Sequence, residues 1–279
     1  MIPLNLGMRA HDLTAHTKEE LVEKLHHYDL GHIQLAVKKS FPELAPSLST
    51  ITNGTASFLG DYLLQQHIHI SVLGCYVNIS SLDETVRQEA VNSFIHHLTL
   101  AKDFHCTLVG TETGSLKTGY TTDNFTEEAY IRARASILKM VEAAEKLGVL
   151  VGIEAGLNHP LYTFELAKRL VDEVASPNLK IIFDAANLVR PDNFKDQVKN
   201  TYNAINALQD HIAAVHLKDY VMEDNHVKIV PVGTGKMDYT DILKFIKYDR
   251  PLMFASLEAV REDHLIQSQK FITEKYAEI

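Results

Sequence analysis

Short apolar runs alternate with longer amphipathic stretches along the whole chain. The runs predict eight buried strands, which lie at Leu4–Met8, His32–Leu35, Ile68–Leu73, Thr107–Gly110, Leu150–Glu154, Lys180–Asp184, Ala213–Leu217 and Leu252–Leu257. Successive runs begin 28 to 43 residues apart, so each interval has room for one strand and one crossover helix. The pattern therefore predicts repeated β–α units around a parallel sheet.

Several of the amphipathic stretches have recognisable ends. Thr17–Tyr28 begins with a Thr-Lys-Glu-Glu capping box, and Thr126–Leu147 begins with a threonine and two glutamates and stops at Gly148. Further helices are predicted over Leu82–Phe104, Leu161–Val174 and Met237–Ile246. The histidine pairs in such stretches, His26-His27 and His96-His97, are predicted to face solvent.

Eight β–α units in 279 residues favour an α/β fold, a single (β/α)8 TIM barrel that spans residues 1–279 as one domain. No low-complexity linker divides the chain. The alternative is an open doubly wound sheet, but its glycine fingerprint is missing, since Gly7 stands alone after the first strand. A phosphate-binding Walker A loop is also missing, because Gly235-Lys236 is followed by Met237.

Composition and charge restrict the class of protein further. With 46% hydrophobic and 23% charged residues the chain reads as globular, and its net charge of −9 argues against a nucleic-acid partner. The sequence has neither a basic, apolar leader nor a run of about 18 apolar residues, so we expect a cytoplasmic protein without a membrane partner. Cys75 and Cys106 are too few for a disulfide framework and are expected to be buried.

Four polar residues follow the last four predicted strands at similar positions. They are Glu154, Asp184, His216 and Glu258, and 30, 32 and 42 residues separate them. Each gap is about one β–α repeat, and a barrel gathers the carboxyl ends of its strands at one rim. We therefore expect the four side chains to meet there. The alternative is that surface carboxylates follow the strands by chance.

Three carboxylates and one imidazole at one rim would repel one another unless a cation lies between them. An oxygen-rich ligand set with one histidine suits a divalent ion. The sequence therefore predicts a metal site made of Glu154, Asp184, His216 and Glu258, with one ion per chain. Mn²⁺ is the first expectation, with Mg²⁺, Co²⁺ or Zn²⁺ as alternatives.

Five short motifs carry a resemblance to a known family. They are Gly152-Ile-Glu154, Phe183-Asp184-Ala-Ala-Asn187, His216-Leu-Lys-Asp219, Gly233-Thr-Gly235-Lys-Met-Asp238-Tyr239 and Ser256-Leu-Glu258. Each is weak alone, but their order and spacing are fairly specific. The chain resembles the sugar (phosphate) isomerase/epimerase superfamily of xylose isomerase-like TIM barrels over essentially its whole length.

The resemblance implies a reaction as well as a fold. It implies that the four residues hold one metal ion and that Glu154 and Glu258 are also the catalytic acid/base pair. The implied reaction isomerises or epimerises a monosaccharide or sugar phosphate, with proton transfer through a metal-bound enediolate. The expected partner is thus a small carbohydrate. Exposed helix faces of such barrels often pair, so a homodimer or a homotetramer is possible as well.

Four further residues near the rim are predicted to bind substrate. Glu112 follows the fourth strand, and the alternative for it is a loop-stabilising role. His159 follows Glu154 closely, where many relatives have a histidine, although it could simply precede Pro160. Asn187 lies where related epimerases often carry a histidine, and it could instead cap a loop. Lys218 could bind a substrate oxygen or phosphate, or form a salt bridge to a rim carboxylate.

Other functions remain open on the same residues. An inosose dehydratase or an isomerase of the hydroxypyruvate type would use much the same metal set. An apurinic endonuclease with three zinc ions would need more rim histidines and a basic face, which this acidic chain lacks. A catalytically silent, carbohydrate-sensing barrel would not need two acid/base glutamates.

Overall fold

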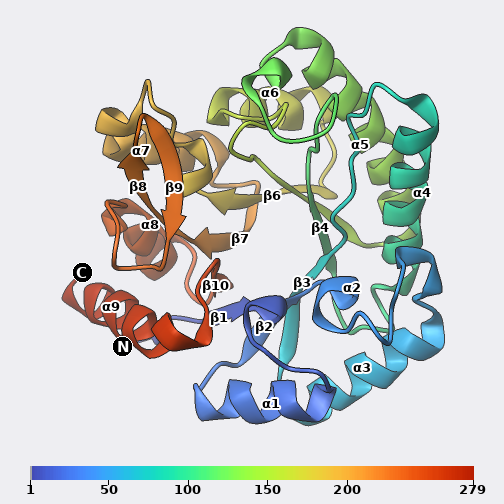
Figure 1. Ribbon diagram of the computed structural model, residues 1–279, viewed down its shortest axis with the longest axis horizontal. Coiled ribbons are helices and arrows are strands. Elements are labelled where there is room, and N and C mark those ends of the chain that lie inside the picture. Colours follow the sequence, from blue (N-terminus) through green and yellow to red (C-terminus); the bar gives the residue numbers. More distant parts are fainter. Residues whose placement is uncertain (1) are drawn as a thin grey trace.

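The computed structural model describes residues 2–279 and contains eight parallel strands that close into a barrel (Figure 1). The barrel strands are β1 (Leu6–Arg9), β2 (His32–Leu35), β3 (His69–Gly74), β4 (Leu108–Glu112), β5 (Leu150–Glu154), β6 (Leu179–Asp184), β7 (Ile212–Leu217) and β10 (Ala255–Leu257). Because β1 pairs with both β2 and β10, the sheet has no edge. The predicted (β/α)8 barrel is confirmed, and the open sheet is excluded.

Helices surround the barrel (Figure 1). They are α1 (Lys18–His27), α2 (Val37–Ser40), α3 (Asn53–Gln65), α4 (Glu84–Leu100), α5 (Glu127–Leu147), α6 (Phe164–Val174), α7 (Gln197–Leu208), α8 (Thr240–Lys244) and α9 (Glu262–Glu278). Short 3₁₀ turns lie at Ala10–Asp12, Leu48–Thr50, Thr122–Asn124, Ala186–Leu188 and Phe194–Asp196. No helix in the part of the chain that the structure describes is both long enough and apolar enough to span a bilayer.

Two glycines make room for a packed barrel interior. A Cβ atom added at Gly110 would lie 2.6 Å from Ile182 Cδ1, and one added at Gly152 would lie 2.9 Å from the same atom. Ile182 belongs to a small buried cluster with Val72, Leu108 and Ala214 that is separate from the main core. The strands therefore bury apolar side chains on both faces, which explains their nearly continuous apolar runs.

The helix ends agree with the sequence in part. Thr126 caps α5 by accepting a hydrogen bond from the backbone N–H of Ala129, and Gly148 ends the helix with a left-handed φ of 66°. At α1 only half of the predicted capping box forms. Thr17 accepts from the N–H of Glu20, but the Glu20 carboxylate accepts from the N–H of His16 instead of Thr17.

Three predicted helices have other limits than expected. The helix predicted over Leu82–Phe104 is α4, which ends at Leu100. The helix predicted over Leu161–Val174 begins only at Phe164, because Thr163 caps it and accepts from the N–H of Leu166. The helix predicted over Met237–Ile246 is the short α8, which continues as a π-helical turn over Phe245–Asp249.

An antiparallel hairpin that the strand count did not predict follows β7. It consists of β8 (Asp219–Glu223) and β9 (His226–Val230), which are visible as a two-stranded ribbon in Figure 1. Asp224 and Asn225 form its turn with φ values of 48° and 60°. Asparagine and aspartate tolerate this left-handed conformation better than most residues do, so the turn has a sequence signal.

One histidine prediction is wrong. The side chain of His97 is buried in α4, and its Nδ1–H donates to the carbonyl oxygen of Ser93 at 2.8 Å. Burial lowers the pKa of His97 to about 4, so the ring is neutral at pH 7. Cys75 and Cys106 are both free and buried, as expected.

Candidate metal centre

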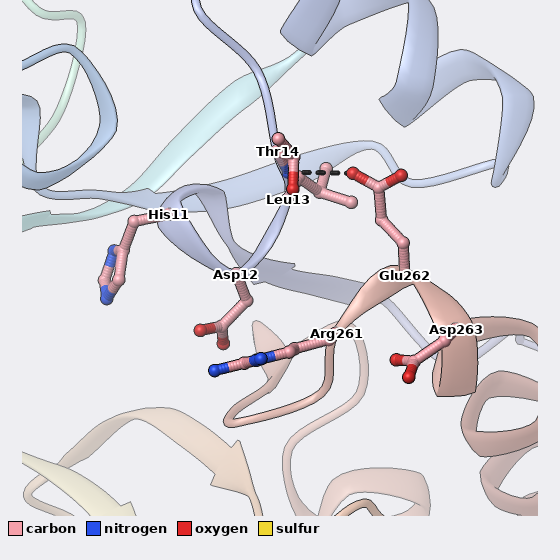
Figure 2. A pocket seen from close by; sticks show the side chains of 7 residues that line it. All are labelled: His11, Asp12, Leu13, Thr14, Arg261, Glu262 and Asp263. Carbon is pink, nitrogen blue, oxygen red and sulfur yellow. Dashed lines mark hydrogen bonds between the residues drawn. The ribbon is translucent and has the colours of Figure 1, made fainter.

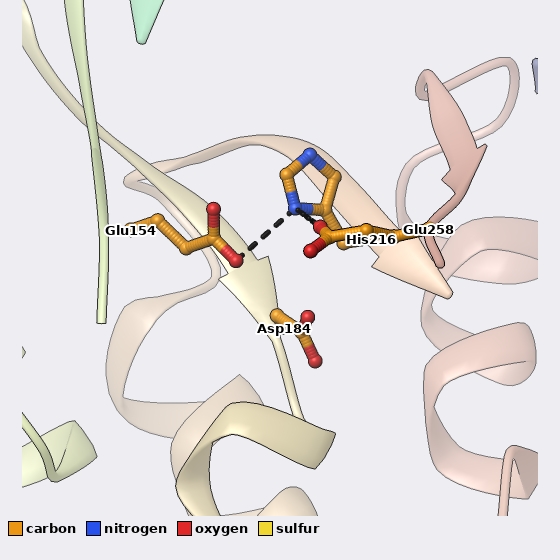
Figure 3. Close-up of side chains that lie close together, drawn as sticks. All are labelled: Glu154, Asp184, His216 and Glu258. Atoms are coloured by element: carbon orange, nitrogen blue, oxygen red, sulfur yellow. Dashed lines mark ion pairs between the residues drawn. The ribbon is translucent and has the colours of Figure 1, made fainter. Parts of the chain in front are cut away.

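Four side chains from neighbouring strands meet at the carboxyl end of the barrel (Figure 3). Glu154 and Asp184 end β5 and β6, His216 is the next-to-last residue of β7, and Glu258 follows β10. One ligand atom from each lies within 4.8 Å of the others, and all four residues are buried. Within residues 2–279 this is the one group of three or more His, Cys, Asp or Glu side chains arranged in this way.

The orientation of His216 is fixed by a chain of hydrogen bonds. Its Nε2–H donates to Gln34 Oε1 at 2.6 Å, and Gln34 Nε2 in turn donates to the Tyr76 hydroxyl. The other ring nitrogen, Nδ1, then faces the carboxylates, 2.7 Å from Glu258 Oε2 and 3.2 Å from Glu154 Oε1. Such a bond to the far nitrogen is the usual way in which a protein aims an imidazole at a metal ion.

Burial and mutual charge shift the acidity of these groups in different directions. Burial lowers the pKa of His216, but Glu154 and Glu258 outweigh it and raise the pKa to about 10. Burial raises the pKa of Asp184, and Lys218 only partly opposes this. Burial also opposes ionisation of Glu258, yet Lys218, His216 and Arg9 together hold its pKa well below the usual range.

Two of the donor atoms lack a hydrogen-bond partner in the protein. Asp184 uses Oδ1 to accept from the backbone N–H groups of Ala186 and Asn187, whereas its Oδ2 is buried without a hydrogen bond. His216 Nδ1 is likewise buried, and the groups beside it are the carboxylates of Glu154 and Glu258. Three carboxylates and an imidazole nitrogen that converge on one buried point are the oxygen-rich donor set that a divalent cation takes, so this residue set fits a metal ion.

Two cationic side chains also reach this cluster. The ammonium of Lys218 lies 2.9 Å from Asp184 Oδ2 and 2.6 Å from Glu258 Oε1, and it donates to Asn187 Oδ1 at 3.0 Å. Arg9 donates to Glu258 Oε1 at 2.8 Å and to both oxygens of Asp12. Of the two roles considered for Lys218, the salt bridge to a rim carboxylate is the contact present here.

The other residues predicted to touch substrate lie at the same end. Glu112 pairs in register with Glu154 across β4 and β5, and its carboxylate is 3.9 Å from His159 Nε2. The Tyr120 ring stacks on His159 with the ring centres 4.1 Å apart. Asn187 donates from Nδ2 to Glu154 Oε1 at 2.7 Å, so its amide orients a predicted metal ligand.

The outer groups differ in acidity from the inner ones. Burial, aided by the charges of Glu154 and Glu258, raises the pKa of Glu112 to about 7. Burial lowers the pKa of His159 to about 4, and the charge of Lys218 acts in the same direction. Glu112 can therefore exchange a proton near neutral pH, whereas His159 is a neutral ring.

A separate pocket of about 510 Å³ lies between residues 11–14, which follow β1, and residues 261–263 at the start of α9 (Figure 2). Asp12 and Arg261 reach into it, and the carboxylate of Glu262 accepts a hydrogen bond from the N–H of Thr14 at 2.7 Å. Glu262 also pairs with Lys24 at 2.6 Å. These contacts join the segment after β1 and helix α1 to the start of α9.

The comparisons with known proteins agree with this architecture. A family model described as the xylose isomerase-like TIM barrel matches residues 22–275. This chain belongs to that family. No curated protein sequence gives a significant match.

Several solved structures share the fold at low sequence identity. A D-tagatose 3-epimerase-like protein is 18% identical with a TM-score of 0.76, over 100% of this chain and 97% of that chain. The IOLI protein with a bound zinc atom is 15% identical with a TM-score of 0.75, over 100% and 99%. A barrel from Mycobacterium smegmatis in complex with magnesium is 15% identical with a TM-score of 0.68, over 100% and 97%.

Several residues that organise this xylose isomerase-like site were not identified from sequence. Arg9, Gln34 and Tyr76 come from β1, β2 and the segment after β3, and no spacing rule links them to residues 154–258. Unlike Arg9, Gln34 and Tyr76, Asp219 has a link to the site in the sequence, because it directly follows Lys218. Its carboxylate accepts from the N–H groups of Tyr220, Gly233, Gly235 and Met237, and it thereby holds the turn after β9.

Proposed function

We propose that this protein is a divalent-metal-dependent isomerase or epimerase that acts on a monosaccharide or a sugar phosphate. One observation carries the proposal, namely the convergence of ligand atoms from Glu154, Asp184, His216 and Glu258 on one buried point. Zinc and magnesium in two solved barrels of similar fold support a metal site of this kind. Mn²⁺ remains our first expectation for the ion.

The four residues would hold the metal, and Glu154 and Glu258 would also transfer protons in the proposed reaction. When bound, the ion supplies Lewis-acid stabilisation of negative charge on substrate oxygens. Glu154 ends β5 and Glu258 follows β10, with β6 and β7 between these strands, so the two carboxylates approach the centre from different sides. Two carboxylates on different sides can remove a proton from one face of a carbon and return it on the other.

The surrounding contacts suit these roles. Arg9 pairs with Glu258 Oε1 at 2.8 Å and keeps this carboxylate ionised, as a group that accepts a proton must be. Asn187 fixes Glu154 Oε1 from one side. Glu112 and His159 form the wall next to Glu154, where they can bind the hydroxyl groups of a sugar.

Competing functions differ in what they require of the site. A dehydratase or an isomerase of the hydroxypyruvate type would begin with the same proton removal, so only product analysis separates them from an epimerase. A three-zinc endonuclease needs further ligands, and residues 2–279 contain only the one four-residue group. A silent sensor barrel would bind metal or sugar without exchanging carbon-bound protons.

The test combines metal analysis with proton exchange. Wild type, Glu258→Gln and the exposed control Glu142→Gln are loaded with Mn²⁺, desalted and analysed for bound metal. The same proteins are then incubated with a panel of ketoses and ketose phosphates in D₂O, and deuterium incorporation is followed by NMR. We expect about one ion per chain and deuterium uptake for wild type and Glu142→Gln. Weaker binding and no uptake are expected for Glu258→Gln.

Other outcomes point elsewhere. Metal binding without exchange on the whole panel would favour the sensor barrel. Failure of the wild type to retain any ion would contradict the proposal at its first step. About three zinc ions per chain in the unloaded protein would favour the endonuclease instead.

A further inference from the structure

The side chain of Lys218 enters the cluster that the proposed function assigns to a metal ion. Its ammonium contacts three oxygens, at 2.9 Å from Asp184, 2.6 Å from Glu258 and 3.0 Å from Asn187. The side chain is only 7% exposed. The ammonium is a compact cation with three oxygen neighbours among the carboxylates. It therefore occupies a position where a metal ion would be expected to bind.

The ammonium and a metal ion would need the same atoms. Asp184 Oδ1 is already used by two backbone N–H groups, so Oδ2 is the oxygen it can offer to a metal. That oxygen is the one that Lys218 faces. Glu258 offers Oε1 to Lys218 and Oε2 to His216, so the ammonium also holds the second carboxylate.

The backbone of Lys218 is fixed beside the cluster, whereas its side chain can move away from the carboxylates when an ion binds. Its backbone carbonyl accepts a hydrogen bond from the Tyr239 hydroxyl at 2.9 Å, and the next residue, Asp219, is fixed by four backbone N–H groups. The contact to Asn187 does not involve a predicted metal ligand. The flexible stem of a lysine can therefore give up the carboxylates while the backbone stays in place.

We propose that Lys218 is a built-in cation that competes with the divalent ion for Asp184 and Glu258. This inference rests on the metal site of the proposed function. In the metal-free protein Lys218 compensates the buried carboxylates, and metal binding must displace the ammonium from them. Lys218 thus stabilises the metal-free fold and weakens metal affinity.

The test compares Lys218→Met with the control Lys39→Met. Lys39 lies over the Tyr76 ring and forms no ion pair with the four predicted ligands, so its loss removes the same charge without removing a direct contact to them. Mn²⁺ affinity is measured by calorimetry on chelator-treated protein, and thermal unfolding is followed without metal. We expect Lys218→Met to bind Mn²⁺ at least about 10-fold more tightly and to unfold at a lower temperature without metal. Lys39→Met should stay within about 3-fold of wild type.

Lys218→Gln provides a second variant, because it keeps an amide donor for Asn187 and removes only the charge. It should change affinity and stability in the same directions, and a Lys218 variant that folds only with Mn²⁺ present would support the inference. Unchanged or weaker Mn²⁺ binding by both variants, with normal binding by wild type, would overturn the competition and leave the proposed function standing. If neither wild type nor variants bind Mn²⁺, the competition and the metal site fail together.

Discussion

Replacement of Asp219 by asparagine tests how the loop beside the metal centre is held. Asp219 Oδ1 accepts from the N–H groups of Tyr220 and Met237 at 2.8 and 2.9 Å, and Oδ2 accepts from those of Gly233 and Gly235 at 2.9 and 3.0 Å. These four bonds join the start of β8 to the turn that follows β9. An ionised carboxylate is the side chain that can accept all four at once.

The size of the effect follows from the lost acceptors. Asparagine keeps one carbonyl oxygen, which can serve one pair of N–H groups, and its NH₂ then points at the other pair. Two charge-assisted bonds are lost and two buried or partly buried N–H groups are left unpaired, at about 1–3 kcal/mol each. We therefore expect Asp219→Asn to lower the free energy of unfolding by about 3–5 kcal/mol.

Urea unfolding followed by circular dichroism measures this loss. Asp224→Asn is the matched control, because Asp224 is exposed in the hairpin turn and has a φ of 48°, which asparagine tolerates well. The control should stay within about 0.5 kcal/mol of wild type. If Asp219→Asn loses less than about 1 kcal/mol, the four hydrogen bonds do not stabilise the fold as argued.

Three further predictions concern other parts of the chain. Gly235→Ala should lower stability by about 1–3 kcal/mol in the same urea assay, because its Cβ would lie 2.4 Å from the carbonyl oxygen of Tyr220; wild-type stability would contradict this. His97 has a folded-state pKa of about 4 against an ordinary value of 6.5, so its contribution is complete above pH 6.5 and is lost as the pH falls towards 4. His97→Leu should therefore lose about 2 kcal/mol less than wild type between pH 7 and pH 5, and equal losses would refute the assignment. Gln34→Leu should weaken Mn²⁺ binding about 10- to 100-fold in calorimetry by freeing His216 Nε2, and unchanged affinity would show that this bond does not orient the ring.

The fold could be predicted because each barrel strand is buried on both faces and reads as a short apolar run. The limits of the strands were less accurate, as β10 shows, which was predicted from Leu252 but begins at Ala255. The hairpin was missed because the interval between the last two predicted strands looked like one ordinary β–α repeat. Its turn residues Asp224 and Asn225 carried the signal that could have revealed it.

The four predicted metal ligands could be named because each stands at the end of its own strand, and a barrel gathers such ends at one rim. Neighbours that come from the first strands, such as Arg9 and Gln34, could not be named, since contacts such as Arg9 with Glu258 depend on how the barrel closes. These two residues are 249 positions apart in sequence, and they meet because β1 pairs with β10. Lys218 was identified as a rim residue, but sequence alone left its partner open.

The order of residues at the end of β7 couples stability to metal binding. His216 and Lys218 are two positions apart and both reach the carboxylates, as alternate residues of an extended chain do. Asp219 follows at once and holds the backbone there through four N–H groups. When Asp219 no longer accepts all four hydrogen bonds, the backbone of Lys218 is held less firmly. Asp219→Asn should therefore change Mn²⁺ affinity as well as the free energy of unfolding. Asp224→Asn should change neither, because the turn it occupies lies at the far end of the hairpin from β7.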